Sequence, residues 1–239
     1  MKNNGPLGVA VISNPTNSMI RNSYTSTYTT FQAYATYIKS INKAHNFTLL
    51  GGYSYEDFRD LLISVGASTL VTNDFFSLGW GDAKTKTNSD QIATWATAAF
   101  FGRFTYNFKE KYLFEANLRY DGSSRLAPST RWNTFPSFSA GWNIDKEDFF
   151  QGAKATIQGL KLRASWGQLG NSNALGLYDY ISMLNARSNL PFNNANTQYI
   201  YQSTLASPTK TWETVETSNI GIDVSTLNSR FVFTADAYI

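Results

Sequence analysis

Hydrophobic and polar residues alternate with a period of two through the middle of the chain. Outside a short polar turn at 109–111, the even positions from Phe100 to Tyr120 carry apolar or aromatic side chains and no charge, whereas the odd positions carry most of the charged ones. Successive side chains of a strand point to opposite faces, so this pattern predicts two strands joined by that turn. A third strand over 132–144 repeats the pattern, with Phe138 and Trp142 on its apolar face.

The same alternation, interrupted by clusters of Gly, Asn, Ser and Pro, divides the rest of the chain into strands and connections. We expect about eight strands, over residues 25–41, 46–57, 91–108, 112–121, 132–144, 160–169 and 211–225 and from 231 onward. The first 24 residues are expected to be loop-like, with a candidate short strand at 7–12. Residues 58–90 and 170–210 are predicted to be long connections, and 145–159 to contain a short helical turn.

Alternation alone does not say whether the apolar face contacts lipid or a second sheet. The strands are about 9–13 residues long, whereas a soluble strand averages about 5–6 and a tilted transmembrane strand needs about 9–11. Aromatic side chains of the kind found at membrane interfaces lie near the strand ends, at Tyr106, Tyr112, Tyr120, Trp132 and Trp142. These features favour a transmembrane barrel over a soluble β-sandwich.

Short and longer connections alternate along the chain. The short turns at 42–45, 109–111 and 226–230 are separated by longer connections, and the segment 145–159 fits this order least well. An up-and-down barrel with tight periplasmic turns and larger extracellular loops produces such an order, which a Greek-key sandwich has no reason to produce. We therefore expect an all-β, antiparallel up-and-down transmembrane β-barrel segment.

The composition excludes several classes of function. The chain has 239 residues and no Cys, which rules out disulfides, thiolate metal sites and Cys nucleophiles. Its net charge of +3 is spread without a basic cluster, so we expect no nucleic-acid partner. The sequence contains no run of about 18 apolar residues that would predict a transmembrane helix. A mean hydropathy of −0.30 is compatible with strands that have one polar face.

The two ends of the chain suggest a piece of a longer protein. Residues 1–18 lack the apolar stretch of about 7–15 residues that a signal peptide needs, although an outer-membrane protein must be exported. The chain also stops within the alternation of its last strand, at Ile239. We therefore expect residues 1–239 to be part of a larger barrel domain.

The polar face of the strands carries the candidate functional residues. Eight charged residues share this face and could line the lumen of a barrel: Arg103, Glu115, Arg119, Arg131, Lys161, Arg163, Asp223 and Asp236. Buried polar groups are usually hydrogen-bonded, so we expect these side chains to form satisfied networks with one another or with a plug. A path for a substrate is the alternative interpretation.

Other motifs give no case for catalysis or for a cofactor. Glu147 and Asp148 are adjacent, so they do not converge on a substrate and predict a solvated turn. His45, the only His, is expected to be exposed in a short turn, and it leaves neither a multi-His metal site nor a Ser-His-Asp arrangement. The stretch 121–125 could bind sugar, but a strand-end turn in which Asp accepts backbone hydrogen bonds and Gly supplies a positive φ is simpler. We expect no catalytic residue, no metal and no cofactor.

Several short motifs follow one another in a characteristic order. They are Gly102-Arg103, Asp121-Gly122-Ser123-Ser124-Arg125, Phe135-Pro136-Ser137, Ala140-Gly141-Trp142, Leu160-Lys161-Leu162-Arg163-Ala164-Ser165, Trp212-Glu213 and Asn219-Ile220-Gly221. With this order and spacing the chain closely resembles the SusC/RagA family of TonB-linked outer-membrane proteins of Bacteroidetes. The resemblance is dense over residues 98–239 and weaker over 25–57.

The resemblance implies a 22-stranded barrel with an N-terminal plug, which imports glycans, oligosaccharides or peptides with energy passed from the TonB complex. A SusD-like surface lipoprotein would cap the barrel, and outer-membrane lipid would surround it. We find neither a plug domain nor a TonB-box segment, so the chain corresponds to part of the barrel. Two alternatives from other classes are a soluble β-sandwich that binds carbohydrate or serves in adhesion, and a passive porin whose strands close alone into a small barrel.

Overall fold

The computed structural model describes residues 17–72, 74, 77–192 and 195–239. Its strands are β1 Ser18–Ile41, β2 His45–Ser68, β3 Thr87–Phe108, β4 Tyr112–Ser123, β5 Trp132–Asn143, β6 Ile157–Asn171, β7 Met183–Phe192, β8 Ala195–Thr204, β9 Glu213–Thr226 and β10 Phe231–Tyr238. Its 3-10 helices are η1 Leu78–Trp80, η2 Ala83–Thr85, η3 Ile144–Lys146 and η4 Asp148–Ala153. The last two confirm the helical turn predicted within 145–159. Among the described residues, no helix is long and apolar enough to cross a membrane.

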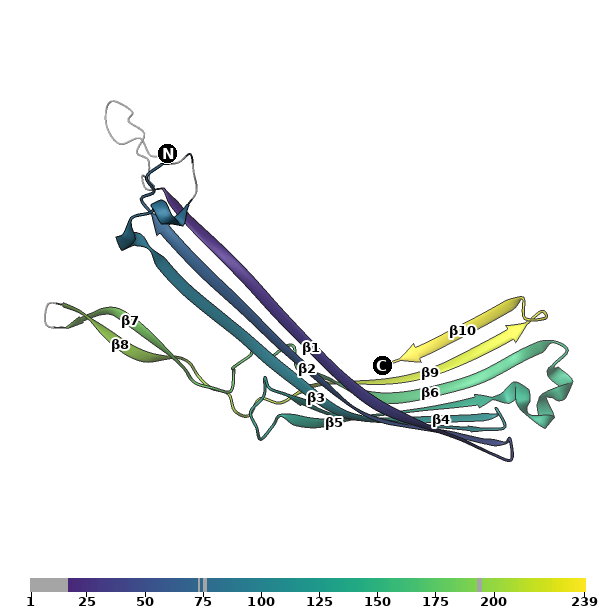
Figure 1. Cartoon of the computed structure of the whole chain (residues 1–239). Coiled ribbons are helices and arrows are strands. Elements are labelled where there is room, and N and C mark those ends of the chain that lie inside the picture. Colours follow the sequence, from purple (N-terminus) through teal and green to yellow (C-terminus); the bar gives the residue numbers. More distant parts are fainter. Residues whose placement is uncertain (1–16, 73, 75–76, 193–194) are drawn as a thin grey trace, which may run out of the picture. The chain divides into compact units, whose positions relative to one another are not determined.

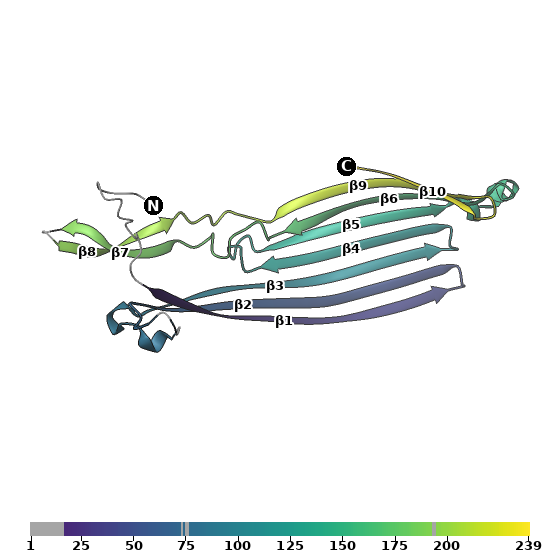
Figure 2. The same cartoon turned by 90° about the horizontal axis from the view of Figure 1, so that it is seen from above.

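In the described part of the chain, eight strands form one sheet in the order β1-β2-β3-β4-β5-β6-β9-β10 (Figure 1), and β7 pairs only with β8. The strand pairs β3–β4, β4–β5, β5–β6, β6–β9 and β9–β10 are all antiparallel. Figure 2 shows neighbouring strands of the sheet joined by connections at alternating ends. This topology confirms the predicted all-β, antiparallel fold class.

The chain divides into two compact units, Met1–Tyr28 with Phe58–Thr94 and Thr29–Asp57 with Trp95–Ile239. The boundary crosses β1, β2 and β3, so each of these strands contributes to both units. In the first unit, the Ser26 hydroxyl donates to Asp60 at 2.6 Å across two strands. The second unit holds all eight of the candidate lumen residues, and their geometry is described within it.

The first strand is longer than the alternation predicts. β1 begins at Ser18, so residues 18–24 are strand and the loop predicted for them is wrong. The candidate strand at 7–12 lies outside the described residues.

The connection predicted over 58–90 is also wrong, because β2 continues to Ser68 and β3 begins at Thr87. β1 and β2 have 24 residues each, which corresponds to about 80 Å of extended chain. The hydrocarbon core of a bilayer is only about 30 Å thick. A charged run over 56–60 interrupts the alternation of β2, although the odd positions Leu61, Ile63, Val65 and Ala67 resume it.

The connection predicted over 170–210 is wrong as well, because it contains the β7–β8 hairpin. The base of this hairpin is held by an ion pair of 2.7 Å between Lys210 Nζ and Asp179 Oδ2. The backbone N–H of Ser207 also donates to the carbonyl of Asp179 at 2.8 Å. The hydrogen bond from Lys210 lowers the pKa of Asp179 below its usual value.

The tight turns hold non-glycine residues in the left-handed region. Asn42 and Lys43 have φ angles of 51° and 54°, and Lys109 and Glu110 have 50° and 57°. Hairpin turns of this kind match the twist of the flanking strands only when φ is positive. In the second turn, Asn107 Oδ1 accepts the backbone N–H of Glu110 at 2.8 Å, which helps to hold the strained conformation.

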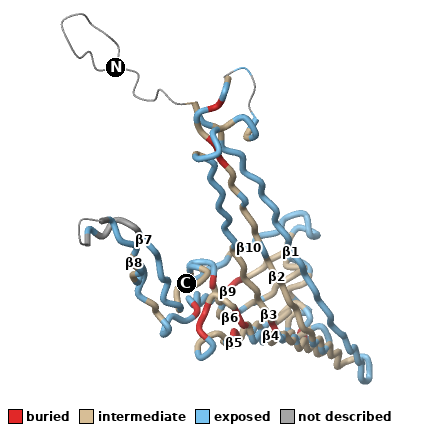
Figure 3. The backbone as a smooth tube through the Cα atoms, turned by 60° about the vertical axis from the view of Figure 1, so that its left-hand side comes forward, coloured by how far each residue is buried: buried red, intermediate tan, exposed pale blue. Residues whose placement is uncertain are grey.

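The apolar face of the sheet, which we call the outer face, is open. Phe100, Phe114 and Phe138 are 54%, 41% and 45% exposed, and Figure 3 shows most of the sheet as exposed or half-buried. Within the described residues, no second sheet covers this face, as a soluble sandwich would require. β1 and β10 end the strand order, so the described strands do not close alone into the small barrel of the porin alternative.

Pro136 lies inside β5 although it has no N–H to donate. It is opposite Leu118 of β4, but the ladder between β5 and β6 begins one position later, at Ser137 opposite Gly167. One side of the strand is therefore free at Pro136, and the missing donor costs no hydrogen bond of the β5–β6 ladder.

The stretch 121–125 contains the predicted strand end and turn, since β4 ends at Ser123 and residues 124–125 form a turn, but Asp121 and Gly122 do not have the roles predicted for them. β4 continues to Ser123, and Asp121 pairs with Arg119 instead of accepting backbone hydrogen bonds. Gly122 does not have a positive φ; a Cβ there would approach the ring of Trp132 to 2.7 Å. The glycine is therefore required for the close packing of a tryptophan.

A small core closes the loops at this end of β4 and β5. Leu126, Phe135 and Trp212 are 1%, 4% and 8% exposed and pack together, with the rings of Phe135 and Trp212 edge to face at 5.4 Å. Trp212 Nε1 donates to the carbonyl of Arg131 at 2.8 Å. Residues distant in the sequence thus fix the loop against the strand that follows it.

Glu147 is buried, so the solvated turn predicted for it is wrong, whereas the side chain of Asp148 is 98% exposed. The carboxylate of Glu147 accepts hydrogen bonds from Lys111 Nζ at 3.0 Å and from Trp142 Nε1 at 3.1 Å. Hydrogen bonds from Tyr112, Trp142 and Lys111 lower the pKa of Glu147, and the bond to Glu147 raises the pKa of Lys111. Glu147 therefore joins the β3–β4 turn to the η3–η4 segment.

The outer face can be tested at Leu162 of β6, which lies between Trp142 and Ile222 in the sheet. If this face meets lipid, Leu162→Arg should destabilise the protein by roughly 2–4 kcal/mol near the midplane. Leu162→Phe should be nearly neutral, because lipid accommodates the added side-chain volume. In a packed protein core the same overpacking would lower the free energy of unfolding by about 1–3 kcal/mol. Ser165→Arg, on the polar face, should have a mild effect. The measurement is denaturant unfolding in lipid vesicles, and equal costs for the Phe and Arg substitutions at Leu162 would contradict the assignment.

The burial of Glu147 predicts a dependence of stability on pH. Its folded pKa lies below the ordinary value of 4.5, so the charged carboxylate stabilises the fold above that pH and loses this effect as the pH falls through the folded pKa. Glu147→Gln should therefore be less stable than the unsubstituted protein near neutral pH, and the difference should shrink below about pH 4. Asp148→Asn is the matched control and should change little. Unfolding midpoints for Glu147→Gln that stay lower by a constant amount across this range would contradict the expectation.

Candidate functional site

The candidate site is the polar face of the sheet, which we call the inner face. Strand pairing aligns odd positions of β3, β4, β5, β6 and β9 with one another, so charged residues distant in the sequence lie on the same side. Arg103, for example, is opposite Asn117, and Lys161 is opposite Asp223. The face is a consequence of register, because a slip by one residue would exchange it with the apolar face.

Arg163 is the centre of the most connected network on the inner face. Its Nε and Nη2 donate to the two carboxylate oxygens of Asp223 at 2.8 and 3.1 Å, and its guanidinium also contacts Asp236 at 3.2 Å. Thr234 donates to Asp223 at 3.1 Å. The three charged side chains are each about one-third exposed, and such charge-assisted, bidentate contacts are the stronger kind of hydrogen bond.

Gly221 makes the contact between Arg163 and Asp236 possible. Arg163 of β6, Gly221 of β9 and Asp236 of β10 form one row across three strands. A Cβ at Gly221 would approach Asp236 Oδ1 to 2.4 Å and Arg163 Nη2 to 2.8 Å. The absence of a side chain in the middle of the row lets the two outer strands pair charges across it.

A second network joins β3, β4 and β5. Arg103 Nε donates to Asn117 Oδ1 at 2.8 Å and lies 3.8 Å from Glu115. Asn117 Nδ2 in turn donates to Glu115 Oε1 at 2.9 Å and to Ser137 Oγ at 3.3 Å. Half of the Arg103 side chain remains exposed, so this network is a solvated one.

Arg119 pairs along its own strand. Its Nη2 and Nε donate to Asp121 at 2.8 and 3.2 Å, and its guanidinium lies 5.8 Å from the centre of the Phe101 ring. Phe101 packs so closely over Gly52 that a Cβ there would approach the ring to 2.5 Å. An aromatic ring thus lies on the otherwise polar inner face.

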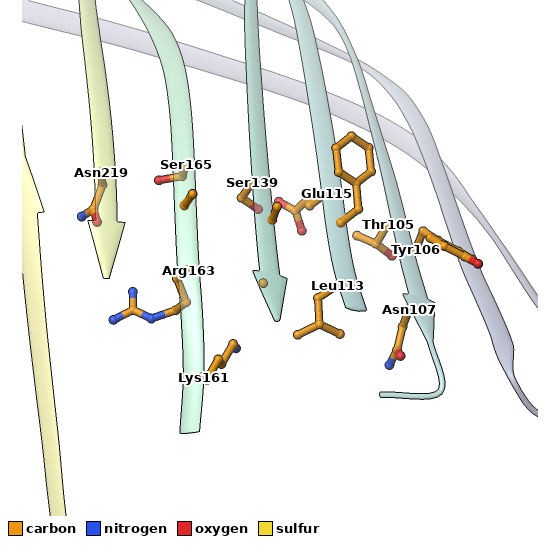
Figure 4. Close-up of a pocket in the computed structure, with 14 residues that line it drawn as sticks. Thr105, Tyr106, Asn107, Leu113, Glu115, Ser139, Lys161, Arg163, Ser165 and Asn219 are labelled. Atoms are coloured by element: carbon orange, nitrogen blue, oxygen red, sulfur yellow. The ribbon is translucent and has the colours of Figure 1, made fainter. Parts of the chain in front are cut away.

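Lys161 differs from the arginines, because the described residues give it no ion pair within 4.0 Å. It lines a hollow of about 360 Å³ with Arg163, Glu115, Ser139, Ser165 and Asn219. Figure 4 shows that the labelled side chains of this hollow come from neighbouring strands of the sheet and that Tyr106 points away from the others. The hollow offers hydroxyl, amide, carboxylate and ammonium groups side by side.

A larger hollow of about 650 Å³ lies on the inner face toward the loop end of the strands. It is lined by charged, amide and aromatic side chains, among them Glu56, Arg119, Asp121, Phe135, Asn171 and Trp212. Phe135 and Trp212 are buried in the loop core. The hollow therefore places the wall of that core beside charged and amide groups of the strands.

Arg131 is the candidate that the structure does not bring into these networks. It precedes β5, in the loop, and its Nη2 donates to the carbonyl of Leu126 at 3.5 Å. The Nε of Arg131 is buried without a hydrogen-bond partner. Alternation assigns Arg131 to the inner face because it is an odd position. The assignment does not apply, because Arg131 lies one residue before the start of β5.

Several partners in these networks were missed by the sequence analysis. Asp121 and Asn117 lie two residues from charged neighbours on one strand face, a spacing that the period of two would have revealed. His45 was expected to be exposed in a turn, but it is the first residue of β2, is half-buried, and contacts the Tyr106 hydroxyl through Nδ1 at 2.8 Å. In the described chain, no group of three His, Asp or Glu side chains could hold a metal ion.

Comparisons with known proteins identify relatives of the chain. A family model described as TonB dependent receptor-like, beta-barrel, matches residues 3–239. The chain is 31% identical to TonB-dependent receptor P3 of Formosa agariphila over 89% of its length and 30% identical to TonB-dependent receptor SusC of Bacteroides thetaiotaomicron over 87%. It spans only 21% and 20% of those two proteins. These matches confirm the resemblance carried by the motifs.

Solved structures agree on the fold. The chain superimposes on the RagAB peptide transporter with a TM-score of 0.85 and 24% identity, covering 95% of this chain and 25% of that one. The RagAB peptide importer in its open-open state gives a TM-score of 0.83 over the whole of this chain. The likeness extends to the arrangement of the strands described above.

The row through Gly221 gives a test of the Arg163 network. Gly221→Ala should force Arg163 and Asp236 apart, and an overpacked position typically costs about 1–3 kcal/mol. Gly51→Ala is the matched control, because a Cβ at Gly51 meets nothing within 4 Å. Adding Asp236→Ala to Gly221→Ala should restore part of the lost stability, because it removes the carboxylate that the new methyl group would meet. Unfolding in lipid vesicles measures all three, and equal effects of Gly221→Ala and Gly51→Ala would contradict the role of the glycine.

Proposed function

The chain belongs to the TonB-dependent receptor β-barrel family, and from that premise we propose that it forms part of the wall of an outer-membrane importer of glycans, oligosaccharides or peptides. The observation that carries this proposal is the two-sided sheet. Its exposed apolar face suits lipid. Its opposite face carries paired charges, and hollows lined in part by charged and amide groups, which suit a water-filled lumen.

The inner face would line the transport lumen. Arg103, Glu115, Arg119, Lys161, Arg163, Asp223 and Asp236 are the lumen residues in this proposal, and Arg131 would contribute from the loop before β5. Most of these charges already have partners on the wall, which keeps the wall rigid, whereas Lys161 and the exposed part of Arg103 would be available to a plug or a substrate.

The remaining parts of the importer would lie elsewhere in a longer protein. Among the residues that the structure describes, β1 and β10 each lack a neighbour on one edge, which supports this, because a barrel wall needs a neighbour at every strand edge. A SusD-like surface lipoprotein and the TonB complex are the partners we propose for the complete importer. The short turns would face the periplasm and the loops at the opposite end the cell surface. We expect no catalysis by this chain.

Two adjacent residues of β5 test the proposal. Ser139 lines the inner hollow, whereas Phe138 does not line it and lies on the outer face, opposite Ala116 and Trp166. In the complete importer, Ser139→Cys should react with a water-soluble thiol reagent, and a bulky adduct there should reduce uptake of labelled oligosaccharides or peptides by cells. Phe138→Cys should react poorly and should leave uptake unchanged.

The opposite labelling pattern would reverse the two faces. Normal uptake of both labelled oligosaccharides and labelled peptides by cells that lack the importer would count against the transport function itself.

A further inference from the structure

A continuous row of aromatic rings follows the turn end of the outer face. The ring centres of Phe47 and Tyr106 are 4.9 Å apart, those of Phe108 and Tyr112 are 6.3 Å apart, and those of Tyr112 and Trp142 are 6.5 Å apart. All three pairs are stacked, with interplanar angles of 25°, 19° and 13°. The His45 ring joins the first pair to the second, because its centre is 6.1 Å from that of Tyr106 and 4.7 Å from that of Phe108. The row therefore runs across β2, β3, β4 and β5 without a gap.

The polar atoms of this row are engaged with protein groups. Tyr106 is hydrogen-bonded to His45, and Trp142 donates its N–H to Glu147. Tyr112 also hydrogen-bonds to Glu147. With these atoms satisfied, the apolar ring faces are what remains for a neighbour, an arrangement that suits the boundary between lipid and water.

The η4 helix continues the row beyond the last strand. The Phe149 ring contacts Trp142 edge to face, with a centre-to-centre distance of 6.5 Å and an angle of 63°. Phe149 is nevertheless 71% exposed, more than Phe100, Phe114 or Phe138 on the strands, so most of its ring is available to a neighbour outside this chain. The buried Glu147, bonded to Lys111 and Trp142, fixes the start of η4 beside the row.

Cationic side chains accompany the row. In the described structure, Lys43 in the β1–β2 turn, Lys109 in the β3–β4 turn and Lys154 after η4 form no ion pair, and Lys109 Nζ lies 5.4 Å from the centre of the Phe108 ring. Unpaired ammonium groups beside aromatic rings match the phosphate layer that borders the acyl chains of a phospholipid leaflet.

We propose that η4 is an interfacial anchor, in which Phe149 inserts into the phospholipid leaflet that borders the turns and extends the aromatic row beyond the strands. This proposal rests on the membrane location in the proposed function. It adds a lipid contact made by a segment that does not span the membrane. Continuity with the row favours lipid as the occupant over a protein partner, because the Phe149 ring abuts Trp142 on the same outer face.

Neighbouring residues of η4 provide the test, and the absence of Cys from the chain makes single-site labelling simple. Phe149→Cys and Asp148→Cys are each introduced into the complete importer, labelled with an NBD fluorophore and reconstituted in vesicles of phosphatidylethanolamine and phosphatidylglycerol. Any cysteine elsewhere in that protein is first replaced by Ser. Doxyl groups on the acyl chains then act as quenchers within the membrane, and iodide acts as the quencher in water.

The proposal predicts strong doxyl quenching and weak iodide quenching at position 149, with the reverse at position 148. Equal doxyl quenching at the two positions would overturn it. Protection of position 149 from both quenchers would also overturn it and would indicate a protein occupant. If Phe149→Cys fails to fold, Phe149→Trp retains the ring, and extra doxyl quenching of its fluorescence over the unsubstituted protein gives the same readout.

Uptake by the labelled variants separates this inference from the proposed function. Normal uptake without quenching at position 149 would refute the anchor and leave the importer standing. Loss of the uptake function would not alter the quenching result.

Discussion

Backbone hydrogen bonding between neighbouring strands is the constraint on which this structure depends. The sheet has no second layer, and the buried apolar residues of the described chain are few and gather mainly near the loops, as Leu126, Phe135 and Trp212 do. In a lipid environment every N–H and C=O must be paired within the protein, so the ladder takes the place of a packed interior. Register then decides everything else, because it assigns each side chain to lipid or to water.

Glycine recurs where register alone would bring large groups too close. Gly221 leaves room for Arg163 and Asp236, Gly52 accepts the ring of Phe101, and Gly122 accepts the ring of Trp132. In none of these cases is a positive φ the reason. The missing side chain makes space on a crowded face, so charged and aromatic groups from flanking strands can meet across the strand between them.

The sequence predicts the faces of the strands well and their ends poorly. Residues such as Phe114 and Glu115 are assigned to opposite faces by alternation, which is a local property of a strand. The far end of β2 escapes prediction because a charged run over 56–60 interrupts its alternation, and that of β1 because residues 18–24 do not alternate. The burial of Glu147 escapes it for another reason: its partners, Lys111 and Trp142, come from other elements. The Arg163 network is partly predictable. Alternation assigns its charged members to the polar face, but the role of Gly221 becomes clear only from the register of β6, β9 and β10.

The length of β1, β2 and β3 has a consequence for how the protein can vary. Where a strand runs through lipid, each position must satisfy both the ladder and the surrounding solvent. Where it would continue beyond the bilayer, exposed side chains need only suit water and are freer to change, although close packing such as that of Ala67 against Gly81 still limits some positions. Strand segments outside the membrane could thus diversify in charge and shape, and present new epitopes to antibodies or bacteriophages, while the barrel that supports them keeps its architecture.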